Sequence, residues 1–294
     1  MENENKGKNI VLMVIAIAAM FLIIIFSEPI GGLIFGDLNN STNPALSTFF
    51  MYISGTLPMC VIVILLCLIV KPYRSLLRLF GGKSGSNCAK WILLGIVFGA
   101  GANMVVAVFA MLSGSIQLTF NRFEIQWVLL LFLGVLIQSA SEELLCRMLV
   151  MQMIRKVFPQ FPIIAILGNA VIFSLLHILN PGTSALALLV LMLIGVLYSL
   201  IVYYSHSIWG AIIAHTTWNF TQSIVLGLPN SGKVVPYYIW GLSGDTVSGM
   251  AYDQTFGLES SWISLLVLAI CCTIVILIGK KETLANCRKT FQNV

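Results

Sequence analysis

The residues best suited to chemistry in this chain lie in the stretch Ser141–Arg147, in the middle of an otherwise apolar segment. Glu142, Glu143 and Arg147 supply two carboxylates and a guanidinium, and no other predicted span carries an acid or a base except histidine. Each such charge costs roughly 2.5–3.5 kcal/mol at the centre of a membrane helix on insertion scales. Charges this costly indicate a buried partner or a chemical task.

The spacing of these residues separates their roles. Glu143 and Arg147 are four residues apart, in the favourable order for an ion pair on one helical face. Glu142 points about 100° away, with Gln138 and Cys146 nearest on its own side. We therefore expect Glu143 to balance Arg147 and leave Glu142 available as a general base. The alternative is a purely structural ion pair with Glu142 protonated and inert.

Three further polar residues lie in later apolar segments. His177 ends the sequence Phe173-Ser-Leu-Leu-His177 in the run 162–179. His215 and Asn219 lie one turn apart on one helical face in the run 207–228. His206 is interpreted as a solvated loop residue. If their helices adjoin, the site has a base for water and hydrogen-bond donors for an oxyanion, as a peptide hydrolase requires. A proton-coupled transporter also uses buried Glu and His and remains open on these residues alone.

The elements that must position these side chains are membrane helices. The 294 residues are 59% hydrophobic and 9% charged, against about 25% charged in soluble domains. Apolar runs long enough to span a bilayer predict an all-α polytopic membrane protein with about eight helices and a single domain, residues 1–294. The runs are 10–26, 48–70, 91–113, 127–154, 162–179, 185–205, 207–228 and 261–279. The seven cysteines have no metal-site spacing.

Basic residues predict the orientation of these helices. Thirteen Lys and Arg residues fall on one side of the predicted spans, and only Arg122 and Lys233 fall on the other. The positive-inside rule therefore places both termini in the cytoplasm. The thirteen are Lys6, Lys8, Lys71, Arg74, Arg78, Lys83, Lys90, Arg155, Lys156, Lys280, Lys281, Arg288 and Lys289. The net charge of +5 thus reflects membrane orientation, and we expect membrane lipids and no nucleic acid as partners.

Three motifs in order resemble a known family. They are Glu142-Glu143-x-x-x-Arg147, Phe173-x-x-x-His177 and His215-x-x-x-Asn219. Together they resemble the CAAX prenyl protease and bacteriocin-processing (CPBP, or Abi) intramembrane endopeptidases. The resemblance covers about 138–222, within a catalytic core at 127–228. The family usually continues the first motif as Phe-Arg-Gly, whereas this chain has Cys146-Arg147-Met148, which indicates altered substrate access.

The resemblance implies cleavage of a peptide bond in a membrane-associated peptide or protein, with or without a lipid anchor. Glu142 with His177 would activate water, His215 and Asn219 would stabilise the oxyanion, and Glu143 with Arg147 would support the site. Family members are commonly labelled metalloproteases. Zinc held by Glu142, His177 and His215 and a metal-free mechanism both remain open.

The resemblance and the spans also predict where the site lies. We expect a multi-pass protein of the cell membrane with a cavity nearer the cytoplasmic side. At about 1.5 Å per residue, Glu142 and His177 meet only if the fifth helix begins below the membrane or tilts. The competing interpretations are a non-proteolytic bacteriocin-immunity or scaffold protein of the same fold and, less favoured, a transporter with a broken helix near Gly168 and Asn169.

Overall fold

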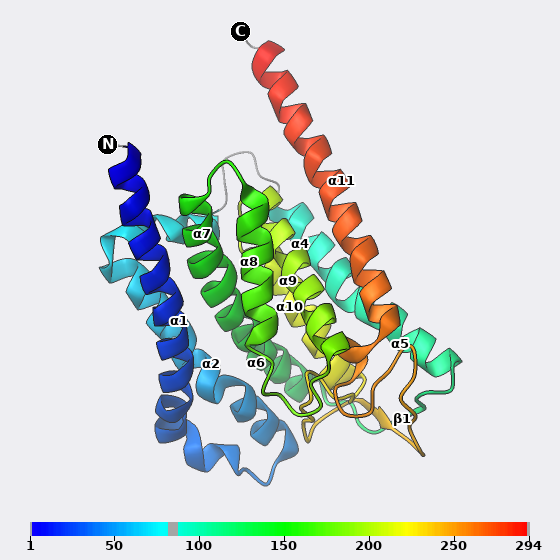
Figure 1. The fold of residues 1–294 in the computed structure, drawn as a ribbon. Coiled ribbons are helices and arrows are strands. Elements are labelled where there is room, and N and C mark those ends of the chain that lie inside the picture. Colours follow the sequence, from blue (N-terminus) through cyan, green and yellow to red (C-terminus); the bar gives the residue numbers. More distant parts are fainter. Residues whose placement is uncertain (1, 82–87, 293–294) are drawn as a thin grey trace.

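Every apolar run forms a helix in the computed structural model, which describes residues 2–81 and 88–292 (Figure 1). Lys83, used in the orientation argument, lies outside the described residues. The α-helices are α1 (Glu2–Asn39), α2 (Pro44–Ile69), α3 (Arg78–Gly81), α4 (Cys88–Ile96), α5 (Ala102–Leu112), α6 (Ile125–Glu143), α7 (Met151–Val157), α8 (Pro162–Leu175), α9 (Ala185–Ser205), α10 (Trp209–Phe220) and α11 (Trp262–Gln292).

The remaining elements are short. Three π-helical segments join or extend the helices: η2 (Val97–Gly101) between α4 and α5, η3 (Leu144–Val150) between α6 and α7, and η4 (Thr221–Val225) after α10. Two are 3₁₀-helices, η1 (Lys71–Leu77) and η5 (Leu258–Ser260). The strands β1 (Leu118–Phe120) and β2 (Trp240–Leu242) pair antiparallel, with Leu118 opposite Leu242.

The helix lengths define an integral membrane protein. Among the described residues, six helices are long and apolar enough to cross a bilayer. The apolar helix α8, with 14 residues, and the α10–η4 segment are shorter than a full span. Large apolar side chains also lie exposed on the outer surface, including Leu33 and Leu179. The all-helical membrane class is confirmed, whereas the number of eight spans stays a prediction.

Two helices differ from the sequence prediction. The first apolar run was expected to end at residue 26, but α1 continues to Asn39 through Pro29. It therefore contains Glu28 and Asp37, so the expectation that no other span carries an acid is wrong for the helix as built. The apolar run ended because hydropathy fell, whereas the backbone stays helical. Helix α8 is continuous from Pro162 to Leu175, so the broken helix near Gly168 and Asn169 that the less favoured transporter interpretation needs is absent.

The bundle is built around α9, whose apolar window is 61% buried, against 22% for α1. Ser184 caps α9 by accepting a hydrogen bond from the Ala187 N–H, which satisfies one of the donors left free at a helix start. Both termini lie at one end of the bundle, and β1 with the segment 226–261 lies at the other (Figure 1). Segment 226–261 is tied back to the helices, for example by the Tyr237 N–H, which donates to Thr48 Oγ1 over 3.2 Å.

Helices α7 and α8 form a hairpin that sets the depth of two predicted site residues. The hairpin turns between Val157 and Pro162. Glu142 lies fifteen residues before Val157, and His177 lies fifteen residues after Pro162. Because the two arms are equally long, both residues come to the same level about 22 Å from the turn. The antiparallel hairpin therefore brings the two motifs together.

Candidate active site

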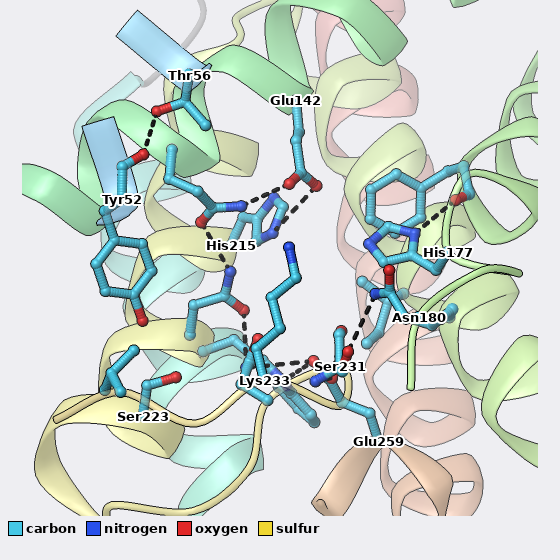
Figure 2. A pocket seen from close by; sticks show the side chains of 18 of the residues that line it. Tyr52, Thr56, Glu142, His177, Asn180, His215, Ser223, Ser231, Lys233 and Glu259 are labelled. Carbon is cyan, nitrogen blue, oxygen red and sulfur yellow. Dashed lines mark hydrogen bonds and ion pairs between the residues drawn. The ribbon is translucent and has the colours of Figure 1, made fainter. Parts of the chain in front are cut away.

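The predicted site residues surround one pocket of about 190 Å³ (Figure 2). Glu142 reaches it from α6, His177 from the turn after α8, and His215 and Asn219 from α10. The pocket is closed from other sides by side chains of α2 and of segment 226–261, including Tyr52 and Lys233. Three sequence motifs that are up to 77 residues apart thus share one cavity, as the sequence predicted.

A fully buried ion pair lies behind this pocket. Arg147 Nη1 donates to Glu143 Oε1 over 2.8 Å, and both side chains are fully excluded from solvent. The Arg147 guanidinium also lies 4.2 Å from the centre of the Phe173 ring and donates from Nη2 to the Gly195 carbonyl over 3.4 Å. A buried charge requires pairing of this kind. The predicted Glu143–Arg147 pair is therefore present in the structure.

The same Glu143 oxygen orients His215. His215 Nδ1 lies 2.9 Å from Glu143 Oε1, so Nδ1 carries the hydrogen and Nε2 faces the pocket. His215 Nε2 lies 3.8 Å from Glu142 Oε2. The Tyr198 ring stacks on the imidazole with centroids 5.2 Å apart and fixes its plane. When the imidazolium forms, its Nε2–H points into the cavity.

Glu142 is the more accessible of the two glutamates. Its side chain is 27% exposed, whereas that of Glu143 is 0% exposed. Gln138 Nε2 donates to Glu142 Oε1 over 2.5 Å, so Glu142 has a neutral partner one turn earlier on the same helix. The other carboxylate oxygen, Oε2, faces His215. Glu142 is thus held in place without being neutralised by Arg147.

His177 lines the pocket to the right of Glu142 in Figure 2, with Tyr52 and Thr56 on the left. Its Nδ1 lies 2.9 Å from the Phe173 carbonyl oxygen, which can only accept, so Nδ1 donates and the Nε2 lone pair is left for a proton. Thr183 Oγ1 donates to the His177 carbonyl over 2.9 Å and holds the turn after α8. Glu142 and His177 therefore flank the cavity as two bases.

A chain of side-chain amides links the site to segment 226–261. Asn230 Nδ2 donates to Asn219 Oδ1 over 3.2 Å and to Glu259 Oε1 over 3.5 Å. Asn219 Nδ2 donates to Gln138 Oε1 over 3.0 Å, and Gln138 Nε2 donates in turn to Glu142. Each amide accepts through its oxygen and donates through its nitrogen, so the orientation of one side chain fixes the orientation of the next. This row of amides therefore donates to a carboxylate at each end, Glu259 at one and Glu142 at the other.

Glu259 anchors the turn that covers the pocket. Ser231 donates to its Oε2 from both the backbone N–H and the hydroxyl, at 2.7 and 2.6 Å, and Trp218 Nε1 donates to Oε1 at 2.9 Å. Burial raises the pKa of the Glu259 carboxyl, and its hydrogen bonds with Ser231 oppose that shift. The anchored turn projects Lys233 toward Glu142 and His215 (Figure 2).

Sequence reasoning missed the contributions of Asn230, Ser231, Lys233 and Glu259. All four lie between the apolar runs 207–228 and 261–279, where the sequence analysis used only the charge of Lys233. The signal available was the polar turn Asn230-Ser-Gly-Lys233 and one acid just before the last helix. The expected position nearer the terminal end is also wrong, because the pocket lies beneath segment 226–261 at the end opposite the termini. Glu142 lies about midway along the continuous α6–α7 helix, and the segment folds in to meet it.

The tentative metal ligands do not form a metal site. Among the described residues, no three His, Cys, Asp or Glu side chains come together in a way that would hold an ion. Glu142 and His215 approach each other to 3.8 Å, but His177 does not join them in a three-residue group. The donor set thus does not fit a three-ligand zinc site.

Fold and pocket together define a helical integral membrane protein with a buried polar site at the meeting point of its central helices. Residues 124–221, about a third of the chain, match the family model described as "Type II CAAX prenyl endopeptidase Rce1-like". This match confirms the family resemblance indicated by the motifs, and it supports a protease. The searches of curated proteins and of solved structures gave no match.

Proposed function

We propose that the chain is an intramembrane endopeptidase that hydrolyses a peptide bond in a membrane-associated peptide or protein. The observation that carries this proposal is the single pocket with two bases and two hydrogen-bond donors, Glu142, His177, His215 and Asn219. These are the groups that water activation and oxyanion stabilisation require. The match to an endopeptidase family over 124–221 supports the same conclusion.

Water activation falls to the two bases that flank the cavity. Glu142, assisted by His177 Nε2, removes a proton from water as its oxygen attacks the carbonyl carbon of the substrate. The proton is then delivered to the departing nitrogen as the C–N bond breaks. General acid–base catalysis of this kind is worth about 10²–10⁴ in rate.

Oxyanion stabilisation falls to α10. His215 carries its first hydrogen on Nδ1 toward Glu143, so its Nε2 donates to the oxyanion as the imidazolium. Asn219 has two amide hydrogens. One is donated to Gln138, and the other can be donated to the oxyanion. Each such donor is worth about 3 kcal/mol of transition-state stabilisation. No step in this mechanism uses a metal.

The proposed setting is the cell membrane, with eight spans, both termini in the cytoplasm and a catalytic core at 127–228. The clustering of described Lys and Arg residues at the terminal end supports this orientation. The pocket then lies nearer the outer side, beneath segment 226–261. The proposed substrates are membrane-associated peptides or proteins, with or without a lipid anchor.

The test compares the wild type with point variants, both in the proteins of the membranes that contain them and in the cleavage activity of the purified chain. Glu142→Gln keeps the shape of the side chain but removes the base, and the exposed Glu28→Gln in α1 is the matched control. We expect Glu142→Gln and His177→Ala to abolish cleavage in proteoliposomes while Glu28→Gln cleaves normally. A protein that folds, inserts and still cleaves after Glu142→Gln is not a protease of this mechanism; a phenotype independent of Glu142 would favour the immunity or scaffold interpretation.

A further inference from the structure

A second cleft, separate from the active-site pocket, lies at the end of the bundle that carries the termini. Its volume is about 660 Å³, and it is built from α3, the end of α7 and the turn between α9 and α10. Its charged lining consists of Arg78, Arg155 and Lys156, with His206 beside them. Among the described residues that line the cleft there is no aspartate or glutamate.

Contacts within the chain position two of the three cations that line this cleft. Lys156 Nζ donates to the Pro72 carbonyl over 3.1 Å and to Ser75 Oγ over 3.4 Å, which fixes its position beside η1. The Arg155 guanidinium lies 5.2 Å from the centre of the Tyr203 ring. Arg78 is exposed at the rim of the cleft. Like charges in one cleft repel unless an anion joins them.

The wall that carries Arg78 is fastened to the bundle. The Ile208 N–H donates to the Leu79 carbonyl over 3.1 Å, and Trp209 Nε1 donates to the Phe80 carbonyl over 2.9 Å. The turn at the end of α9 is fixed as well, because His206 takes the left-handed conformation with φ 53° and its N–H bonds to Val202. The walls of the cleft are therefore held in place by hydrogen bonds within the chain.

We propose that this cleft is a phosphate-binding site. Arginine guanidinium groups match the geometry of phosphate oxygens and bind them in pairs, and lysine adds a point charge. The site lies among the described basic residues of the terminal end, where an anionic phospholipid headgroup would be within reach. The ligand is a phosphate group of an anionic lipid or of a free phosphate compound, and the experiment separates the two sources.

The experiment uses the purified full chain in a neutral detergent and measures its thermal unfolding midpoint as ligand is added. A ligand that binds only the folded protein raises this midpoint in a saturable way. The probes are short-chain phosphatidylglycerol, short-chain phosphatidylcholine and inorganic phosphate. A shift with phosphatidylglycerol alone identifies a lipid headgroup, and a shift with inorganic phosphate that also competes with the lipid identifies a free phosphate.

The variants are Arg78→Gln and Arg155→Gln, with Lys71→Gln as matched control because it removes an exposed charge from η1 outside the cleft. We expect each arginine substitution to weaken binding about tenfold and Lys71→Gln to leave it unchanged. Arg78 is exposed, so its loss should not alter the midpoint of the ligand-free protein. Equal responses to both lipids, equal weakening by Lys71→Gln, or no shift with any probe would overturn the proposal.

Discussion

The buried triad of Arg147, Glu143 and His215 makes a prediction that separates stability from catalysis. The substitution Glu143→Leu removes the acceptor of two hydrogen bonds at once, those from Arg147 Nη1 at 2.8 Å and His215 Nδ1 at 2.9 Å. The guanidinium cannot reach water, because Phe173 and Tyr198 enclose it with ring centres 4.2 and 5.4 Å away. An unpaired buried charge costs about 3–5 kcal/mol, a factor of about 10²–10⁴ in the folding equilibrium.

The double variant Glu143→Leu/Arg147→Met removes the cation as well. Replacing a buried ion pair with apolar side chains of similar size is often close to neutral for stability. We therefore expect the double variant to regain most of the unfolding midpoint that Glu143→Leu loses. It should not regain activity, because His215 Nδ1 still lacks the acceptor that fixes its tautomer, and loss of such an orienting carboxylate costs roughly 10²–10⁴ in rate.

Both quantities are measured on the same purified protein, the midpoint by thermal unfolding in detergent and the activity as initial cleavage rates in proteoliposomes. Arg147→Met alone is the reciprocal control, because it leaves Glu143 buried with His215 as its one remaining partner. If the double variant recovers the midpoint and the full rate together, Glu143 serves only to balance Arg147. That result would refute the assignment of Glu143 as the residue that orients His215.

Three further predictions follow from the network around the pocket. Gln138→Met removes the donor to Glu142, and kcat should fall about tenfold to a hundredfold with KM unchanged; a change in KM alone would contradict this positioning role. Glu259→Gln loosens the turn at Ser231, so trypsin should cut after Lys233 faster than in the wild type, and an unchanged cutting rate would show that the carboxylate does not anchor the turn. A zinc chelator should leave the cleavage rate of purified protein unchanged, because the described His, Cys, Asp and Glu side chains form no three-ligand set; loss of activity that added zinc restores would refute the metal-free mechanism.

Hydropathy and spacing predicted the helices and the motif residues for clear physical reasons. Lipid requires apolar residues over about 20 positions, so each run marks a helix. The four-residue spacing of Glu143 and Arg147 predicted their ion pair, which the structure contains. The same reasoning failed at the end of α1. Hydropathy falls at Glu28, but the helix continues to Asn39 because helical backbone hydrogen bonds do not require apolar side chains.

The position of the pocket could not be obtained in this way. Hydropathy assigns a residue to a span or a loop, and it treated segment 226–261 as lying outside the bundle. The segment instead packs into it through contacts between residues far apart in sequence, such as Tyr237 with Thr48 and Asn180 with Ser231. No local pattern encodes such pairings. Lys233, which counted only toward membrane orientation in the sequence, consequently lines the pocket.

The amide chain shows why segment 226–261 belongs to the site and does not merely cover it. Both Glu259 oxygens accept hydrogen bonds, and Asn230 turns its NH₂ group toward the same carboxyl. That orientation makes Asn219 accept from Asn230 and donate to Gln138, which leaves Gln138 to donate to Glu142. The Gln138 donor thereby holds one oxygen of the Glu142 carboxyl and leaves the other facing His215. The hydrogen bonds between the two glutamates therefore run in one direction, from the turn anchored by Glu259 to Glu142, the proposed base.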